Sequence, residues 1–260
     1  MDKRIGVQFY TIHDSLDTIE NFDKACGRVS DIGYKIVQIS GTALPASEMK
    51  QVLDKYGLEV VTTHRSYYDF TTNPDQIIEY NKTLGSSMCG LGIMPRPAIS
   101  DTKAFCEFIE NVNKFCEMAK KENMCFGYHN HSVEFIKQDG KMIIDRIIEE
   151  TDPETCNFIV DTFWVQNGGK NPEDFIRSLG KRAKAVHFKD YAVDPVLWDK
   201  EAPRMKEVGN GVLNWDGIIR ACEEAGTQWA LVEQDKNWIN DDPFEALKTS
   251  YDYLTKKGFI

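Results

Sequence analysis

The chain has 260 residues, 42% of them hydrophobic, and 41 acidic against 31 basic residues give a formal net charge of −10. This length and composition suit a single domain over residues 1–260 that buries its own core without disulfides or metal staples. The acidic balance argues against nucleic acid or an anionic membrane as a partner. The sequence contains no run of about 18 apolar residues, so we expect neither a signal peptide nor a membrane span.

Short β-rich runs alternate with amphipathic segments of helical length along the whole chain. The predicted strands lie near Ile5–Phe9, Ile36–Ile39, Glu59–Thr63, Met88–Gly92, Cys125–His129, Phe158–Asp161, Ala185–Lys189 and Ala230–Glu233. The predicted helices are Ser15–Ile32, Ala46–Tyr56, Asp75–Leu84, Asp101–Glu122, Ile143–Glu150, Asp174–Leu179, Trp215–Glu224 and Pro243–Lys256. Such alternation is typical of βαβ units that build a parallel sheet.

Eight repeats of a strand followed by a helix favour an α/β fold, the closed (β/α)8 TIM barrel. A doubly wound open sheet is the alternative. That fold binds its ligand at a Gly-rich turn after the first strand, whereas the loop Gln8–His13 contains no glycine. The seven cysteines show no CxxC spacing, which indicates the reduced thiols of a cytoplasmic protein.

Polar side chains with metal-binding chemistry close most of the predicted strands. They are Gln8, His64, His129 to His131 with Glu134, Asp161, His187 with Lys189, and Glu233 with Asp235. In a barrel of this kind the carboxyl ends of the strands meet at one rim, where the active site lies. The sequence therefore predicts that these side chains share one site.

Alternation along a strand shows which side chains face that site. In the run 184–190, His187 and Lys189 point one way and Val186 and Phe188 the other, so the apolar pair is expected to face the helices. Asp161 and Glu233 each follow a buried apolar run. Because an isolated buried carboxylate is costly, we expect a divalent cation to pair them, with an ion pair to Lys or Arg as the alternative.

Six segments spread over nearly the whole chain carry a resemblance to a known family. They are Gly6–Thr11, Tyr128–His131 with Glu134 and Phe135, Asp161–Trp164, His187–Asp190, Val208–Trp215 and Val232–Asp235. In this order they resemble the xylose isomerase-like sugar phosphate isomerase/epimerase family of TIM barrels. That family also includes ketose 3-epimerases, inosose dehydratases and metal-dependent apurinic-site endonucleases.

The resemblance implies one divalent metal ion held by Glu, Asp, His and Glu from the last four strands. Three of these positions fall on Asp161, His187 and Glu233. Many relatives carry the other glutamate on the fifth strand, where this chain has no carboxylate before Glu134. We expect Glu134 as the fourth ligand, with His131 as the alternative. Mn²⁺ is the expected ion, and Mg²⁺, Co²⁺ and Zn²⁺ are the alternatives.

The implied activity is that of an isomerase or epimerase that removes a proton next to a carbonyl of a sugar, keto-sugar or polyol. Glu134, Glu233 and His131 are the expected acid/base groups, and Lys189 would stabilise a developing oxyanion. The missing fifth-strand glutamate leaves open a dehydratase or a keto-glycoside-cleaving lyase. An apurinic-site endonuclease and a non-catalytic sugar-binding subunit are further alternatives, and self-association is left open because relatives are often dimers or tetramers.

Other residues are expected to bind the substrate around this site. Gln8, His64 and Asn130 would hydrogen-bond hydroxyl groups, Trp164 or Trp198 would stack on the ligand, and Arg204 with Lys206 could meet a phosphate or face water. The segment Tyr191–Leu213 resembles a lid over the mouth of the barrel.

Overall fold

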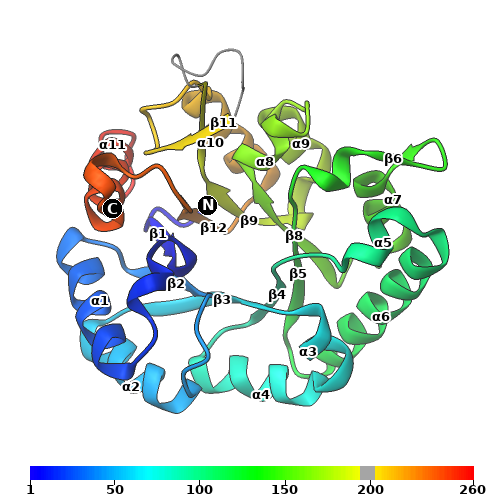
Figure 1. The fold of residues 1–260 in the computed structure, drawn as a ribbon, viewed down its shortest axis with the longest axis horizontal. Helices are drawn as coiled ribbons and strands as arrows, with labels where there is room; N and C mark the ends of the chain where they lie inside the picture. The colour runs from blue at the N-terminus through cyan, green and yellow to red at the C-terminus, as the bar shows by residue number, and fades with distance from the viewer. Residues whose placement is uncertain (194–202) are drawn as a thin grey trace.

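The computed structural model describes residues 1–193 and 203–260 and contains a closed barrel of parallel strands surrounded by helices (Figure 1). The barrel strands are β1 (Gly6–Gln8), β2 (Ile36–Ile39), β3 (Glu59–Arg65), β4 (Met88–Leu91), β5 (Cys125–His129), β8 (Cys156–Asp161), β9 (Ala183–Phe188) and β12 (Trp229–Val232). Strand β1 pairs with both β2 and β12, which closes the ring. The predicted (β/α)8 barrel is confirmed, and the open-sheet alternative is wrong.

Helices form the outer layer of the barrel (Figure 1). They are α1 (Ile19–Ile32), α2 (Ala46–Tyr56), α3 (Tyr67–Thr72), α4 (Pro74–Leu84), α5 (Arg96–Ser100), α6 (Thr102–Lys121), α7 (Ile143–Glu150), α8 (Thr162–Asn167), α9 (Pro172–Leu179), α10 (Trp215–Ala225) and α11 (Pro243–Lys256). Short 3₁₀-helices are η1 (Phe9–Ser15), η2 (Val133–Phe135), η3 (Gly180–Arg182) and η4 (Ile239–Asp241). In the part of the chain that the structure describes, no helix combines the length and the apolar character that crossing a bilayer requires.

Two small antiparallel hairpins stand outside the barrel. One pairs β6 (Lys137–Gln138) with β7 (Lys141–Met142), and the other pairs β10 (Asp190–Val193) with β11 (Pro203–Lys206). The second hairpin falls in the segment for which a lid was predicted. Asp190 fixes its base, because this carboxylate accepts hydrogen bonds from the backbone N–H groups of Gly209 and Gly211 and from Trp215 Nε1.

The predicted helices differ from the observed ones mainly at their first residues. The first helix begins at Ile19 rather than Ser15, because Thr18 Oγ1 accepts the N–H of Asn21 and caps it there, while residues 9–15 form η1. Helices α3, α5 and α8 were not predicted. Each has only five or six residues, too few to show a helical period in the sequence.

An apolar floor fills the barrel interior beneath the polar mouth. It consists of Ile36, Val61, Met88, Ile159, Ala185 and Leu231. Ile159, Ala185 and Leu231 each lie two residues before a polar residue at the mouth, namely Asp161, His187 and Glu233. Since side chains two apart in a strand share a face, the floor and the polar residues line the same inner wall.

Candidate active site

A cavity of about 300 Å³ opens at the carboxyl end of the barrel. It is lined by Tyr10, Ser40, His64, Gly92, Ile93, His129, His131, Lys189, Glu233 and Asp235. A cavity of similar size, about 330 Å³, lies on the outer surface against α7 and α9, and its lining includes Phe135, Ile144 and Phe175. Of these two cavities, the one in the barrel mouth is lined by the predicted catalytic residues His131, Lys189 and Glu233, so it is the candidate active site.

Four buried side chains with metal-binding chemistry converge beside this cavity. His129 ends β5, Asp161 ends β8, His187 lies in β9 and Glu233 directly follows β12. One ligand atom from each lies within 4.8 Å of the other three. Ligands about 2.1 Å from a common ion are up to roughly 4 Å apart, so small movements would bring all four onto one cation.

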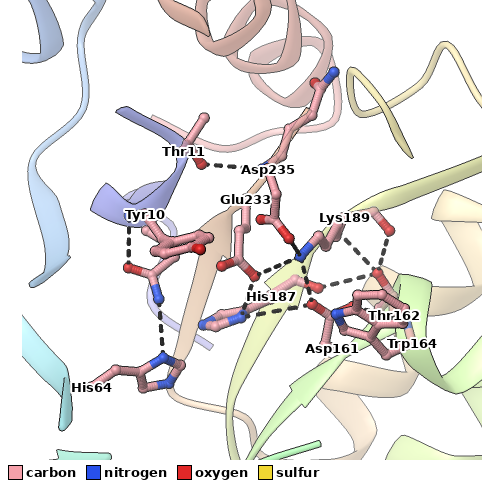
Figure 2. Close-up of polar contacts among 12 residues, drawn as sticks. Tyr10, Thr11, His64, Asp161, Thr162, Trp164, His187, Lys189, Glu233 and Asp235 are labelled. Carbon is pink, nitrogen blue, oxygen red and sulfur yellow. Dashed lines mark hydrogen bonds and ion pairs between the residues drawn. The ribbon is translucent and has the colours of Figure 1, made fainter. Parts of the chain in front are cut away.

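Unsatisfied polar atoms support the fit of a cation at this cluster. Asp161 Oδ2 and His129 Nδ1 are buried without hydrogen-bond partners among the described residues. Figure 2 shows the contact between His187 Nδ1 and Glu233 Oε2, which are 2.8 Å apart. This contact does not have hydrogen-bond geometry. Buried polar atoms normally have partners, and a divalent ion would satisfy these atoms together.

The local fold positions the carboxylate of Asp161. Its Oδ1 accepts the N–H of Trp164 at 3.0 Å and caps α8, which leaves Oδ2 directed at the cluster. Its backbone N–H donates to Asn130 Oδ1 at 3.0 Å. Burial raises the pKa of Asp161 well above its usual value, and the charge of Glu233 adds to this effect while Lys189 opposes it. A cation at Oδ2 would therefore take the place of a proton.

Lys189 lies fully within the site and contacts three carboxylates (Figure 2). Its Nζ is 2.8 Å from Asp235, 3.3 Å from Glu233 and 3.4 Å from Asp161. Burial alone would lower the pKa of Lys189, but these carboxylates raise it, so the amine is an ammonium ion. Burial raises the pKa of Asp235 as it does that of Asp161, so a divalent ion in the cluster would supply the positive charge that keeps these carboxylates ionised.

The pKa of Glu233 moves in the direction opposite to that of Asp161. Burial would raise it, but Lys189 and His187 hold the pKa of this carboxyl well below its usual value. Glu233 is therefore the group of the pair that stays ionised. Glu233 therefore offers an ionised oxygen 2.8 Å from a ring nitrogen of His187, and a metal ion would bind the deprotonated forms of both groups.

His131 forms one wall of the cavity. Its ring packs against His129 and Trp164, with centroid distances of 4.7 and 5.3 Å, and its Nδ1 is buried without a hydrogen-bond partner among the described residues. Burial and the nearby charge of Lys189 lower the pKa of His131 to about 4. Its imidazole is thus neutral near pH 7 and can accept a proton.

Two glutamines contact histidines in the mouth. Gln8 Nε2 lies 3.3 Å from His64 Nδ1, and Gln38 Oε1 lies 2.8 Å from His187 Nε2, in a contact that joins β2 to β9 through the barrel interior. Burial lowers the pKa of His64 well below its usual value, and the proximity of His187 contributes. His64 is therefore also neutral.

Several predicted site residues lie elsewhere or have other partners. The structure separates Glu134 from the four-residue cluster, because its carboxylate oxygens accept hydrogen bonds from Tyr128 Oη at 2.7 Å and the His131 N–H at 2.8 Å. Arg204 lies on β11 opposite Ala192, away from the lining of the cavity. Trp198 lies outside the described residues, whereas Trp164 packs beside Lys189, 5.5 Å from its Nζ.

Gln38 was not among the predicted site residues, and His129 and Asp235 were expected at the rim without a particular role. His129 belongs to the cluster, Gln38 contacts His187, and Asp235 makes the shortest contact with Lys189. For His129 a signal existed, because Phe126 and Tyr128 face α6 and strand alternation then turns residue 129 inward. No local pattern marks Gln38, whose partner is 149 residues away.

Comparison with known proteins identifies the family. The sequence model described as "Xylose isomerase-like TIM barrel" matches residues 26–257. The chain belongs to this family. Among curated proteins, it is similar to an inosose dehydratase of Mesomycoplasma hyopneumoniae strain J, with 24% identity over 90% of this chain and 88% of that protein.

Solved structures share the fold. A sugar phosphate isomerase/epimerase from Parabacteroides distasonis superposes with a TM-score of 0.76 and 23% identity, covering 97% of this chain and 93% of the other. A xylose isomerase-like TIM barrel protein from Mycobacterium smegmatis in complex with magnesium gives a TM-score of 0.75 and 14% identity, covering 98% and 97%. At these identities the likeness establishes the architecture, which agrees with the barrel described above.

Proposed function

We propose that this protein is a metal-dependent lyase that removes water from a keto-polyol or keto-sugar. The observation that carries the proposal is the convergence of His129, Asp161, His187 and Glu233 beside a cavity that also presents His131 and Lys189. Support for dehydration over isomerisation comes from the curated relatives, which are named inosose dehydratase. This differs from the isomerase or epimerase that was the leading expectation from the sequence.

The four clustered side chains would hold the metal ion, with His129 in the position expected for Glu134. Two carboxylates and two imidazoles suit Mn²⁺, Mg²⁺, Co²⁺ or Zn²⁺. When bound, such an ion would polarise the carbonyl group of the substrate and acidify the adjacent C–H bond. Glu134 instead holds the backbone of His131 in place.

His131 would act as the base. Its neutral ring lines the cavity with one unpartnered nitrogen, so it can accept the proton when the C–H bond next to the carbonyl breaks. The Lys189 ammonium would stabilise the negative charge that develops on the substrate oxygen. As the C–C double bond forms, the C–O bond of the β-hydroxyl breaks, and the proton on His131 returns to that oxygen, so that one molecule of water leaves.

A screen of inososes and unphosphorylated or phosphorylated keto-sugars tests this proposal. The protein is stripped with a chelator, reloaded with Mn²⁺, and incubated with each compound in D₂O. We expect loss of the proton next to the carbonyl by NMR together with the ultraviolet absorbance of an unsaturated ketone. Exchange or inversion without that absorbance would assign an isomerase or epimerase, and bound metal without any exchange would contradict an enzymatic role.

Histidine variants provide the control for this screen. His131→Asn should retain the metal and lose proton exchange by about 100-fold or more, since positioned acid/base groups contribute about 10²- to 10⁴-fold. His13→Asn alters the one histidine that lies outside the cluster and the cavity lining, and should retain activity. Equal activity of both variants would exclude His131 as the base.

A further inference from the structure

We infer that His64 acts as a neutral hydrogen-bond donor to an oxygen of the substrate, and that Gln8 positions the donated proton by fixing it on Nε2. The contact with substrate rests on the proposed function, whereas the position of the proton on the His64 ring does not depend on it. It assigns a catalytic role to the half of the mouth formed by β1 to β4.

The orientation of the Gln8 amide follows from its contact with the backbone. The N–H of Tyr10 lies 3.2 Å from Gln8 Oε1 (Figure 2). Because a backbone N–H can only donate, the atom that it meets must be the amide oxygen. The other end of the Gln8 side chain is therefore the NH₂ group, and no flip of the amide satisfies Tyr10 equally well.

This orientation fixes the tautomer of His64. The Gln8 NH₂ group lies 3.3 Å from His64 Nδ1 and can only donate there, so Nδ1 must present its lone pair. An imidazole whose Nδ1 is unprotonated carries its one remaining proton on Nε2. The chain of contacts runs from the Tyr10 backbone through the Gln8 amide to the far nitrogen of His64.

Two glycines, Gly90 in β4 and Gly92 just after it, allow the His64 ring to lie against the barrel wall. A Cβ at Gly90 would lie 2.9 Å from His64 Cδ2 and 2.1 Å from the carbonyl oxygen of Thr63, and a Cβ at Gly92 would lie 3.3 Å from His64 Nδ1. Larger residues there would displace the ring. The ring is thus held by close packing as well as by its hydrogen bond.

The proton on Nε2 lacks a partner among the described residues. His64 lines the cavity, yet its Nε2 is buried and makes no hydrogen bond. An unpaired buried donor is destabilising by roughly 1–3 kcal/mol. A substrate oxygen in the cavity would satisfy this N–H, and a donor aimed at an oxygen that gains negative charge accelerates the reaction.

The tautomer also decides between two sets of metal ligands. Ligand atoms of His64, His129 and His187 lie within 4.8 Å of one another, which by distance alone would suit a three-histidine metal site. A metal binds the lone pair of an imidazole nitrogen. With the proton on Nε2 and Gln8 at Nδ1, His64 has no lone pair to offer, so the ion is left to the cluster that contains Asp161 and Glu233.

The first experiment is NMR of the ¹⁵N-histidine-labelled full chain near pH 7, metal-free and loaded with Mg²⁺. The His64 resonances are assigned as those missing from His64→Asn. We expect a protonated, pyrrole-type shift at Nε2 and an unprotonated, pyridine-type shift at Nδ1 in both samples. The reverse pattern, or an Nε2 shift that responds to the metal as a ligand does, would overturn the inference even if no substrate is found.

The second experiment reverses the tautomer through Gln8→Glu, with the exposed Gln51→Glu as the matched control. A carboxylate at position 8 can only accept, so the His64 proton should move to Nδ1, while the control should keep the parent NMR pattern. With an active substrate, kcat should fall by about 100-fold in Gln8→Glu and His64→Asn with little change in KM. Unchanged kcat in His64→Asn, or loss of bound Mn²⁺ in that variant, would overturn the role of His64.

Discussion

The two halves of the barrel mouth use different chemistry. On the side formed by β5, β8, β9 and β12, the inward residues ending the strands are ionisable and cluster tightly, with Lys189 among three carboxylates. On the side formed by β1 to β4, they are Gln8, Gln38 and His64, of which two are amides. Charge is concentrated in one half, and the other half supplies neutral groups that fix directions of hydrogen bonds.

The two glutamines show how that neutral half serves the charged one. Gln38 Oε1 lies 2.8 Å from His187 Nε2. A proton on Nε2 would donate to this oxygen and leave the Nδ1 lone pair beside Glu233 for a metal ion. Gln8 presents its NH₂ group to His64 and leaves that ring with a donor facing the cavity. In the proposed mechanism, the same residue type would prepare one histidine to bind a metal ion and the other to bind substrate.

The largest expected effect comes from removing a ligand in the charged half. Asp161→Asn keeps the oxygen that caps α8 but removes the negative charge at Oδ2. We expect the dissociation constant for Mn²⁺ to rise by more than about 100-fold, because even partners of metal ligands contribute about 10- to 100-fold. Isothermal titration of the chelated protein measures this, with the exposed Asp174→Asn as control. Parent-like affinity in Asp161→Asn would remove this residue from the ligand set.

Lys189→Met separates catalysis from metal binding within the same half. Removing the ammonium leaves three carboxylates facing one another, so the metal-free protein should lose about 3–5 kcal/mol of unfolding free energy. Bound Mn²⁺ should raise the unfolding free energy of Lys189→Met more than that of the parent. The kcat of this variant should fall by about 100-fold. Denaturant unfolding with and without metal tests this against the exposed Lys114→Met. Loss of metal affinity would mean that Lys189 supports the ion rather than the reaction.

Gln38→Leu tests the neutral half, where a smaller effect is expected. Without the acceptor at Nε2, His187 can place its proton on either nitrogen, and its lone pair no longer faces the cluster in every molecule. The affinity for Mn²⁺ should fall by about 10- to 100-fold. Titration of this variant beside the exposed Gln51→Leu measures the change. Equal affinities would show that the contact between β2 and β9 has no influence on the ion.

Glu134→Gln should have the smallest effect on metal binding. The amide can replace only one of the two acceptor oxygens that face Tyr128 and His131, so stability should fall by about 1–3 kcal/mol. Tyr128→Phe removes one of these hydrogen bonds from the other side and should destabilise the protein similarly. Both variants should still bind one equivalent of Mn²⁺. Complete loss of metal from Glu134→Gln alone would restore this residue as the fourth ligand.

The sequence predicted the barrel because its periodicities are local. Alternation within strands such as 184–190, together with apolar stripes along segments such as Asp101–Glu122, is set by neighbouring residues and survives in the structure. The same property brought Asp161, His187 and Glu233 to one rim. Parallel strands in a closed barrel end on the same side, so residues at strand ends meet whatever lies between them.

The sequence could not predict how the chain turns after β5 or which side chains meet across the barrel interior. After Asn130 the backbone turns into η2, and that turn directs Glu134 at Tyr128 rather than at the cluster. Alternation would have indicated His129, but the family resemblance favoured a carboxylate. The contact between Gln38 and His187 depends on the diameter and closure of the barrel, which no local pattern encodes.

All of these roles depend on one cation bound among His129, Asp161, His187 and Glu233, in the charged half of the mouth. Anomalous diffraction from crystals of the chelated protein reloaded with Mn²⁺ would locate this ion. We predict a single manganese peak in contact with all four side chains and none at His64. A peak coordinated by His64 or Glu134, or no peak in the barrel mouth, would rule out this ligand set.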